Sequence, residues 1–375
     1  MKIAINAITA NDRMRGVERY IVEMLRHLHI PGDENEYVVF YAPWQSYIKN
    51  LTLGDRFRLV EVSLPRNKVF RALWQIFMFT RVIRRYAPDL VHYPNTMPLF
   101  IKEYPTVVTI HDIFEYVSPG AYPLFQMAWR RIVVKYEAKI ADIIITVSDT
   151  TKGALVRVLG IDENKICVVY NGISKDFIIL EHEPPDSGKA LGDYLLCVGV
   201  IDKIKSVDKL IRAYVELPQY LQNKYNLVIA GKPGNAFLAI KNLINKLKLN
   251  NNVLFYGHVS FDKLIKLYRG ARAVIFPSIW EGFGFPIIEA MMAGVPVVTS
   301  NKGACPEIAG DAAIIIDPDN ISVFAKAIES VIIDDNLRSD LIKRGKDNIK
   351  RFDWGISAAG IRRAYSEAFN KGVDH

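Results

Sequence analysis

Short apolar runs rich in β-branched residues alternate with amphipathic stretches along the whole chain, and this alternation constrains the fold most. Most of the runs are continuously apolar, which is typical of parallel strands that are covered on both faces of their sheet. The helical stretches between them indicate an α/β protein with doubly wound parallel sheets. The predicted strands are 3–8, 37–41, 59–62, 90–93, 107–110, 143–147, 166–169, 194–198, 227–230, 253–256, 273–276, 295–298 and 313–315.

The chain has 375 residues, which is long for one hydrophobic core and suits two domains of ordinary size. A polar stretch that contains Pro and Gly, 174–193, separates two series of strands and helices and is interpreted as a linker. We therefore expect one α/β domain over 1–180 and a second over 190–355. Open α/β sheets bind ligands at the carboxyl ends of their strands, so the predicted site is a cleft between the two domains.

Composition indicates a soluble globular protein, since half of the residues are apolar and 23% are charged. Cys167, Cys197 and Cys305 lie far apart, which matches neither a disulfide framework nor a metal-ligand spacing and fits a reducing compartment. The first residues read as a buried strand rather than a signal peptide, and no apolar run approaches the ~20 residues that span a bilayer. The expected location is the cytoplasm, with peripheral attachment to the inner face of the membrane as an open alternative.

The net charge of +8 is unevenly distributed, because the segment 66–85 is basic and contains no acidic residue. Its basic residues are Arg66, Lys68, Arg71, Arg81, Arg84 and Arg85, and they alternate with Phe70, Leu73, Trp74, Ile76, Phe77, Met78 and Phe79. A basic helix with large apolar side chains suits an anionic membrane surface. A core helix with a solvated cationic face is an equally good interpretation. No nucleic-acid partner is expected, because no recognised binding motif accompanies the charge.

Two carboxylates, Glu281 and Glu289, lie in the segment Ser-Ile-Trp-Glu-Gly-Phe-Gly-Phe-Pro-Ile-Ile-Glu. The glycines and the proline between them disfavour a continuous helix, so we expect a strand, a tight loop and a helix that starts near Pro286. Loop amides and the start of that helix would form an anion site. Glu289 would fall in the first helical turn, where an acid also has a purely structural explanation. Glu281, in a loop after a strand, is the stronger functional candidate.

The stretch from Phe276 to Ser300 resembles the signature of glycosyltransferase family 4 (glycosyl transferases group 1), and the similarity continues through Gly-Ala-Cys-Pro-Glu-Ile-Ala-Gly-Asp-Ala-Ala from 303. The resemblance implies the GT-B fold of two Rossmann-like domains and transfer of a hexose from a nucleotide-sugar with retention of the anomeric configuration. It also implies roles for residues here. Glu281 would contact donor sugar hydroxyls, Glu289 would bind the ribose, and the amides around Phe283, Gly284 and Phe285 would approach the sugar and the diphosphate.

Gly-Val-Ile-Asp-Lys-Ile-Lys-Ser at 199–206 resembles the phosphate-binding turn of the same family, in which Lys205 matches a lysine. Val200 stands where an arginine is common, so the diphosphate would have one cation fewer unless Lys203 or another group supplies it. A surface lysine is the structural alternative for Lys205.

Gly16, at the start of a predicted helix, matches a glycine turn of the family that faces the donor phosphates or the acceptor. There is no GxGxxG pattern, so a nicotinamide-type site has no support. His111 follows a strand and matches a histidine near the transferred sugar, where it would form a hydrogen bond rather than act as a nucleophile. Ser148 and Asn171 match family turns too, but helix capping and turn chemistry explain them better.

The resemblance thus implies a retaining hexosyltransferase with no cofactor and no catalytic metal. Lys205 and the turn 283–286 would stabilise the leaving nucleoside diphosphate during front-face attack. UDP-glucose is slightly favoured as donor over GDP-mannose, and the acceptor would be a glycan or lipid-linked glycan of a surface polysaccharide. In the family a C-terminal helix, 356–375 here, crosses back to the first domain. A non-catalytic sugar-nucleotide-binding protein and a sugar-phosphate epimerase or phosphorylase remain the alternatives.

Overall fold

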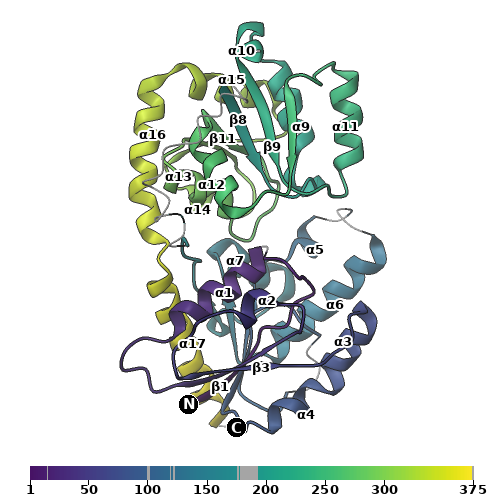
Figure 1. Cartoon of the computed structure of the whole chain (residues 1–375), viewed down its shortest axis with the longest axis vertical. Coiled ribbons are helices and arrows are strands. Elements are labelled where there is room, and N and C mark those ends of the chain that lie inside the picture. Colours follow the sequence, from purple (N-terminus) through teal and green to yellow (C-terminus); the bar gives the residue numbers. More distant parts are fainter. Residues whose placement is uncertain are drawn as a thin grey trace. The chain divides into compact units, whose positions relative to one another are not determined.

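The structure is a computed structural model that describes residues 1–14, 16–98, 102–118, 120, 123–174, 177 and 193–373. It divides into two compact units, shown in Figure 1. Unit 1 comprises Met1–Tyr116, Pro123–Gly172 and Asp353–His375, and unit 2 comprises Val117–Tyr122 and Ile173–Phe352. Most of the predicted linker 174–193 lies outside the described residues.

Unit 1 contains a seven-stranded sheet of order β3-β2-β1-β4-β5-β6-β7, in which all neighbours pair in parallel. Its strands are β1 (Lys2–Asn6), β2 (Glu36–Tyr41), β3 (Phe57–Glu61), β4 (Leu90–Tyr93), β5 (Thr106–Ile110), β6 (Ile143–Thr146) and β7 (Ile166–Val168). Its helices are α1 (Gly16–Leu28), α2 (Ser46–Lys49), α3 (Lys68–Phe77), α4 (Phe79–Arg84), α5 (Phe114–Val117), α6 (Leu124–Ile140), α7 (Asp149–Leu159), η1 (Glu163–Lys165) and α17 (Trp354–Val373).

Unit 2 contains a six-stranded parallel sheet of order β10-β9-β8-β11-β12-β13. Its strands are β8 (Asp193–Val198), β9 (Tyr225–Ala230), β10 (Val253–Gly257), β11 (Ala273–Phe276), β12 (Val297–Ser300) and β13 (Ala313–Ile316). Its helices are η3 (Lys203–Lys205), α9 (Val207–Val215), α10 (Gln219–Lys224), α11 (Phe237–Lys246), α12 (Phe261–Gly270), α13 (Phe285–Met292), α14 (Cys305–Ala309), α15 (Ile321–Ile333), α16 (Asp335–Asn348) and η4 (Ile349–Arg351).

Two parallel sheets with helical crossovers confirm the predicted fold class, and every predicted strand is present. One strand is displaced, because β12 begins at Val297 rather than 295. The residues before it close the end of α13: Gly294 has a φ of +70° and the Val295 amide donates to the Ala290 carbonyl at 2.9 Å. Pro296 follows and has no N–H to offer a sheet, so pairing starts one residue later.

The basic segment 66–85 forms two helices, α3 and α4, rather than the single helix expected from its sequence. Asn67 caps α3, since its side-chain oxygen accepts a hydrogen bond from the Val69 amide at 2.9 Å. The chain turns at Met78, and this turn buries Phe79 against Phe40 and Tyr93 of the sheet. Among the described residues, no helix has the length and apolar character needed to cross a bilayer.

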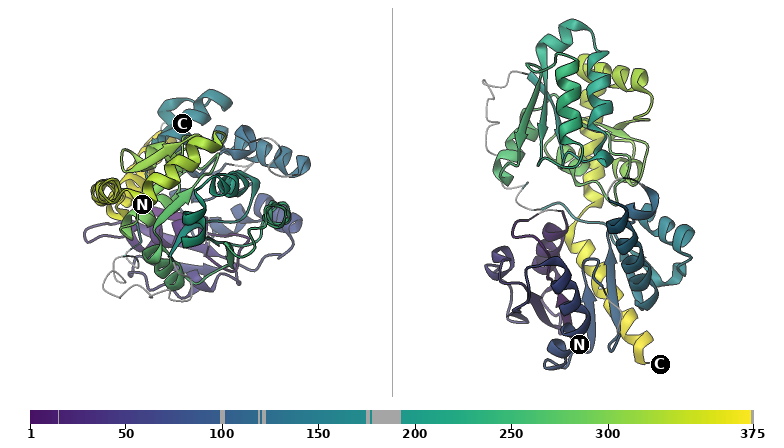
Figure 2. Two further views of the ribbon diagram at one scale, coloured as in Figure 1. Left: turned by 90° about the horizontal axis from the view of Figure 1, so that it is seen from above. Right: turned by 90° about the vertical axis from the view of Figure 1, so that its right-hand side faces the viewer.

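The last helix, α17, belongs to unit 1, where it packs on α1 and on β4, β5 and β6 (Figures 1 and 2). Its buried residues Trp354, Ile361 and Tyr365 complete the core that covers one face of the first sheet. The chain thus returns to unit 1 after it has formed unit 2.

His92 of β4 joins this core as a buried polar residue. Its Nδ1 is hydrogen-bonded to the Tyr365 hydroxyl at 2.8 Å, and its Nε2 to Thr109 Oγ1 at 2.9 Å. Burial lowers the pKa of His92 to about 3. The imidazole is therefore neutral in the folded protein at all ordinary pH values.

The stability of unit 1 should depend on pH through His92. Histidine in an unfolded chain titrates near pH ~6.5, so below that pH the unfolded state binds a proton that folded His92 does not. The contribution is complete above pH 6.5 and is lost as the pH falls towards 3. Between pH 7 and 5, the wild type should lose about 2 kcal/mol more unfolding free energy than His92→Gln in urea denaturation. Equal losses in the two proteins would contradict the assignment.

Candidate active site

Glu281 lies in the loop between β11 and α13 and makes an ion pair with Lys205. Its Oε1 accepts hydrogen bonds from the Lys205 ammonium and from Ser278 Oγ, the latter at 2.6 Å. Lys205 comes from η3, which follows β8, and β8 pairs in parallel with β11. The two loops therefore leave the same edge of the sheet, where carboxyl ends of parallel strands meet. The side chains of Lys205 and Glu281 are 23% and 17% exposed, so the charges are accessible without being fully solvated.

Backbone hydrogen bonds fix the loop of Glu281 between its neighbours. The Ile279 amide donates to the Ile204 carbonyl at 2.9 Å, and the Ala304 amide donates to the Glu281 carbonyl at 3.0 Å. Gly303 makes the second approach possible, because it has a φ of +57° and a Cβ there would lie 2.7 Å from the Glu281 nitrogen. The loop after β12 thus supports Glu281 through main-chain contacts, from the side opposite the loop of Lys205.

Cys305 lies directly after this support and is fully buried. Burial, together with the nearby negative charge of Glu281, raises the pKa of its thiol to about 12. A thiol with so high a pKa is protonated at neutral pH and is a poor nucleophile. Cys305 is therefore a packing residue of the site.

The turn 283–286 leads into α13 as the sequence predicts. Gly284 adopts a φ of +105° as the residue before the helix, and Pro286 occupies the first turn. Phe283 packs edge-on against Phe285, with ring centroids 5.3 Å apart, and against Phe352 at 5.6 Å. The aromatic contacts fix the backbone of a turn that opens a helix N-terminus, an arrangement that attracts anions.

Glu289 occupies the second turn of α13, not the first turn as the sequence suggested, because the helix begins at Phe285. The interaction with a helix dipole is confined largely to the first turn, so the structural explanation for this acid is weaker than expected. The carboxylate is nearly buried, and its Oε2 accepts a hydrogen bond from the Tyr268 hydroxyl of α12 at 2.7 Å. Tyr268 therefore orients Glu289. The two residues lie on different helices, and no local sequence pattern predicts their contact.

The family commonly has an arginine where this chain has Val200, so the other positive charges at this edge of the second sheet are relevant to phosphate binding. Lys203 is exposed, and its amide donates to the Asn235 side chain at 2.9 Å. Lys302 follows β12 and lies 3.4 Å from Asp317, which follows β13. Lys205 also lies over the Phe276 ring, 5.1 Å from its centroid. Of these lysines, Lys205 is the one that the structure joins directly to Glu281.

In unit 1, Gly16 and His111 lie at one edge of the sheet and are linked through α1. Gly16 is the first residue of α1, and Tyr20, one turn later, places its ring edge-on to His111 with centroids 4.7 Å apart. His111 follows β5, and its Nε2 is within 2.9 Å of the Pro94 carbonyl. A carbonyl can only accept, so Nε2 carries the proton and Nδ1 is the acceptor nitrogen.

The environment of His111 favours the neutral imidazole. Burial lowers its pKa, and this effect exceeds the opposing effects of the Pro94 hydrogen bond and the charges of Asp112 and Glu18. Tyr20, which sequence reasoning missed, is held in turn by a hydrogen bond to Thr109 Oγ1 at 3.2 Å. The one sign of this contact in the sequence is that Tyr20 follows Gly16 by four residues, which is one helical turn. Ser148 caps α7 by accepting from the Thr151 amide at 3.1 Å, as predicted.

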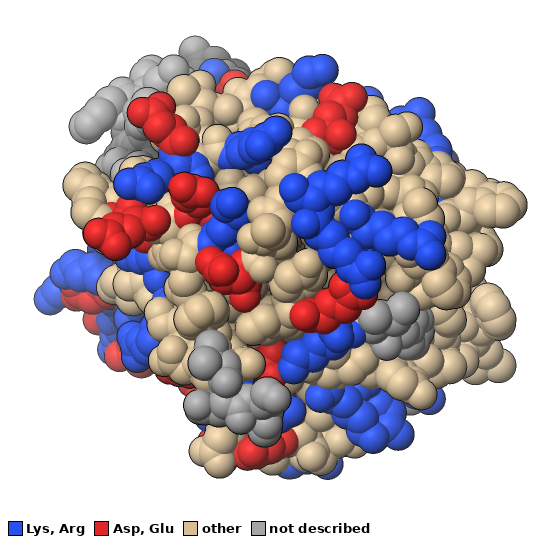
Figure 3. Space-filling view, turned by 90° about the horizontal axis from the view of Figure 1, so that it is seen from below, with Lys and Arg blue, Asp and Glu red and all other residues tan. Residues whose placement is uncertain are grey.

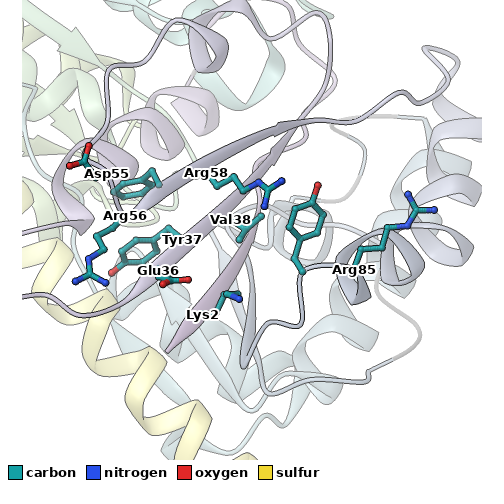
Figure 4. A pocket seen from close by; sticks show the side chains of 10 residues that line it. Lys2, Glu36, Tyr37, Val38, Asp55, Arg56, Arg58 and Arg85 are labelled. Atoms are coloured by element: carbon teal, nitrogen blue, oxygen red, sulfur yellow. The ribbon is translucent and has the colours of Figure 1, made fainter.

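A cavity of about 780 Å³ lies at the opposite edge of the same sheet, beside the amino ends of β1, β2 and β3 (Figure 4). Its lining includes Lys2, Glu36, Asp55, Arg56, Arg58 and Arg85. Gly16 and His111 follow the carboxyl ends of their strands, so this cavity is separate from the candidate site. In the part of the chain that the structure describes, no group of three or more His, Cys, Asp or Glu residues could hold a metal ion.

A single methyl group added at Gly303 should disturb the loop that supports Glu281. Gly303→Ala would place Cβ against the Glu281 backbone, whereas Gly257→Ala, at a nearly equal φ of +61°, would meet no atom within 4 Å. We expect Gly303→Ala to lower the unfolding free energy by about 1–3 kcal/mol more than Gly257→Ala in chemical denaturation, because overpacking adds to backbone strain. Similar losses in both variants would show that the loop relaxes freely.

Comparisons with known proteins identify the family of the chain. The family model for glycosyl transferases group 1 matches residues 183–348, and that for glycosyltransferase family 4 matches 14–177. The chain is 26% identical to O-antigen chain mannosyltransferase B of Escherichia coli, over 97% of the chain and 99% of that protein. It is 30% identical to the uncharacterized glycosyltransferase MJ1178 of Methanocaldococcus jannaschii, over 81% of the chain and 84% of that protein.

Solved structures show the same fold at lower identity. Sucrose-phosphate synthase from Thermosynechococcus elongatus superposes with a TM-score of 0.75 at 19% identity, covering 99% of both chains. Anabaena HepE in complex with UDP-glucose also gives 0.75 at 19% identity, covering 98% of this chain and 99% of that one. Together with the sequence relatives, these similarities show that the chain belongs to glycosyltransferase family 4 and has the GT-B fold.

Proposed function

We propose that this glycosyltransferase transfers a hexose from a nucleoside diphosphate-sugar to a hydroxyl group of a glycan or lipid-linked glycan, with retention of the anomeric configuration. The observation that carries the proposal is the cluster of Lys205, Ser278 and Glu281 at the carboxyl edge of the second sheet. This cluster combines a cation with an oriented carboxylate beside a helix N-terminus. A nucleotide-sugar needs the same groups, since it presents a diphosphate next to sugar hydroxyls.

In this proposal Lys205 and the turn 283–286 stabilise the charge that develops on the leaving nucleoside diphosphate. Glu281 accepts hydrogen bonds from sugar hydroxyls, and Ser278 holds its carboxylate in place at 2.6 Å. Lys205 and Glu281 form an ion pair. Binding of a diphosphate would then redistribute the lysine's hydrogen bonds between two anionic partners, so the carboxylate keeps its lysine while it orients the sugar.

Glu289 is proposed to bind the ribose hydroxyls of the donor. Its carboxylate is held by Tyr268 at 2.7 Å and is almost completely buried. A carboxylate can accept more than one hydrogen bond on each oxygen, so the tyrosine contact is compatible with a ribose contact. A rigidly held acceptor of this kind favours a ligand that presents hydroxyl donors.

Retention is proposed to follow from front-face attack, in which the acceptor hydroxyl approaches on the side from which the diphosphate departs. The departing phosphate oxygens would accept the hydroxyl proton. His111 would act through a hydrogen bond to the sugar, and the burial that lowers its pKa supports a neutral acceptor nitrogen over a charged acid. Lys205 and Glu281 then have electrostatic and orienting roles rather than roles in covalent catalysis.

For the donor, we propose GDP-mannose, with UDP-glucose as the alternative. The signature around Glu281 is compatible with both, and the sequence alone slightly favours UDP-glucose. One relative, which matches 97% of this chain, is named a mannosyltransferase of the O-antigen chain, and this supports mannose as the transferred hexose. The same name supports a surface polysaccharide intermediate as the acceptor.

The role of Glu281 is tested by Glu281→Gln, which keeps the size of the side chain and removes its charge. We expect kcat for nucleotide release to fall by about 10²–10³-fold, the effect of losing one group that stabilises or orients the reacting centre. Glu216→Gln, on the exposed end of α9, is the matched control and should retain full turnover. An unchanged kcat in Glu281→Gln would remove this residue from the mechanism.

A panel of nucleotide-sugars tests the donor and the stereochemistry together. GDP-mannose should be hydrolysed faster than UDP-glucose in the absence of acceptor, as measured by release of the nucleoside diphosphate. NMR of the product formed with an acceptor should show the anomeric configuration of the donor. Preferential use of UDP-glucose would overturn the donor assignment, and an inverted product would overturn front-face attack.

A further inference from the structure

Helix α6 of unit 1 carries a line of large apolar side chains on its solvent-exposed side. Phe125, Trp129, Ile132 and Tyr136 are 86%, 39%, 47% and 50% exposed. Their spacing of four, three and four residues places them on one stripe of an α-helix. The inner side of the helix is occupied by other residues, among them the buried Met127, Val133, Val134 and Ala138. The exposed stripe is therefore additional to the core face of α6.

Helix α3 carries a second stripe of the same kind. Phe70, Leu73 and Phe77 are 62%, 45% and 59% exposed and follow one another at three and four residues. Val69, at 66% exposed, widens the stripe. Isolated exposed apolar residues are ordinary, but a repeated helical stripe of large ones marks an interaction surface.

The topology places α3 and α6 on the same face of the first sheet. The crossover from β3 to β4, which contains α3 and α4, and the crossover from β5 to β6, which contains α6, both move in the same direction across the strand order. Right-handed crossovers in one direction lie on one face. The crossover from β1 to β2 moves the other way, and its helix α1 packs with α17 on the opposite face. Figure 1 shows α3, α4 and α6 on the same side of unit 1.

The surface around the two stripes is basic. The segment 66–85 contains no acidic residue, and its Arg66, Arg81 and Arg85 are exposed. Lys135 and Lys139 are exposed on α6, whose one acidic residue, Glu137, is buried. Seen from below, Lys and Arg side chains gather beside uncharged surface in the right half of Figure 3, the side on which Figure 1 draws α3 and α4.

From these observations we propose that the stripes of α3 and α6 form a surface by which unit 1 docks on an anionic lipid bilayer. Aromatic and aliphatic side chains of an interfacial helix enter the boundary between headgroups and acyl chains, while lysine and arginine contact the anionic headgroups. A second protein molecule would be favoured by the apolar side chains alone, but the surplus of positive charge would oppose pairing with a second copy of this chain. The positive charge of this surface therefore favours an anionic bilayer over a second copy of the chain.

The docking surface also bears on the acceptor, and this consequence rests on the proposed function. Helix α6 follows β5 and His111, so it starts at the carboxyl edge of the sheet where His111 lies. Its first residues, Leu124 and Phe125, are 85% and 86% exposed. Insertion of this end would bring the bilayer to the same edge of unit 1 as the proposed acceptor side of the site. The acceptor glycan is therefore inferred to be carried on a lipid anchored in that bilayer.

Sedimentation with vesicles tests the docking separately from catalysis. The full-length protein is mixed with phosphatidylcholine vesicles with and without 30% phosphatidylglycerol, a composition chosen at roughly the anionic content that gives a strong surface potential. We expect at least a roughly tenfold higher bound fraction on the anionic vesicles, and release as salt is raised, because exposed charges are screened. Negligible or equal binding to both compositions would overturn the proposal.

Substitutions then locate the surface. Phe125→Ser/Ile132→Ser and Phe70→Ser/Phe77→Ser should each reduce binding to anionic vesicles by roughly tenfold or more, since each removes two large apolar side chains from the membrane contact. Leu238→Ser/Ile356→Ser removes side chains that are 75% and 65% exposed on α11 and α17, and it should bind like the wild type. Wild-type binding by both stripe variants would contradict the assignment.

Two further measurements keep the result interpretable. Hydrolysis of the water-soluble donor should be unchanged in the stripe variants, which would show that they are folded and that the donor site is independent of docking. Lys135→Glu/Lys139→Glu should weaken binding while it leaves the apolar stripe intact. If light scattering instead shows a wild-type dimer that the stripe variants dissociate, without vesicle binding, the occupant is a second copy and the bilayer proposal fails.

Discussion

Parallel pairing of every strand is the constraint on which the rest of this structure depends. Parallel neighbours require a crossover connection, so each strand is followed by chain that must cover a face of the sheet before the next strand forms. In both units this buries both faces and sends the loops from the carboxyl ends of neighbouring strands to one edge. The candidate residues of each unit, Lys205 with Glu281 and Gly16 with His111, lie at such an edge.

The Lys205–Glu281 pair illustrates how this edge becomes a site. The two residues are separated by 76 positions in the sequence, but their strands are neighbours. Main-chain hydrogen bonds from both adjoining loops hold Glu281, and Gly303 allows one of those loops to come close. The fold itself thus positions the carboxylate, and such preorganisation lets it orient a substrate without a further cost of ordering.

In unit 1, the helices on one face of the first sheet both cover the core and present the proposed docking surface. On one face of the first sheet, α4 and α6 contribute buried side chains such as Phe79, Ile83, Val133 and Val134, while α3 and the outer side of α6 present apolar stripes and basic groups. The opposite face is closed by α1 and by α17, which arrives from the far end of the chain. Because the core does not need the outer residues of α3 and α6, these positions are available for docking.

The sequence by itself determined the fold class, the strands and a helix that starts near Pro286, because continuous apolar runs, glycine and proline act locally. It also identified Glu281 and Lys205 as candidates through their motifs. It could not determine that Ser278 and Lys205 share one oxygen of Glu281, that Tyr268 holds Glu289, or that Tyr20 packs on His111. Those contacts join residues on different elements, and only tertiary structure brings such elements together. The same holds for the segment 66–85, where one helix was expected and the structure has α3 and α4, with Phe79 at the start of α4 packed against Phe40 of the sheet.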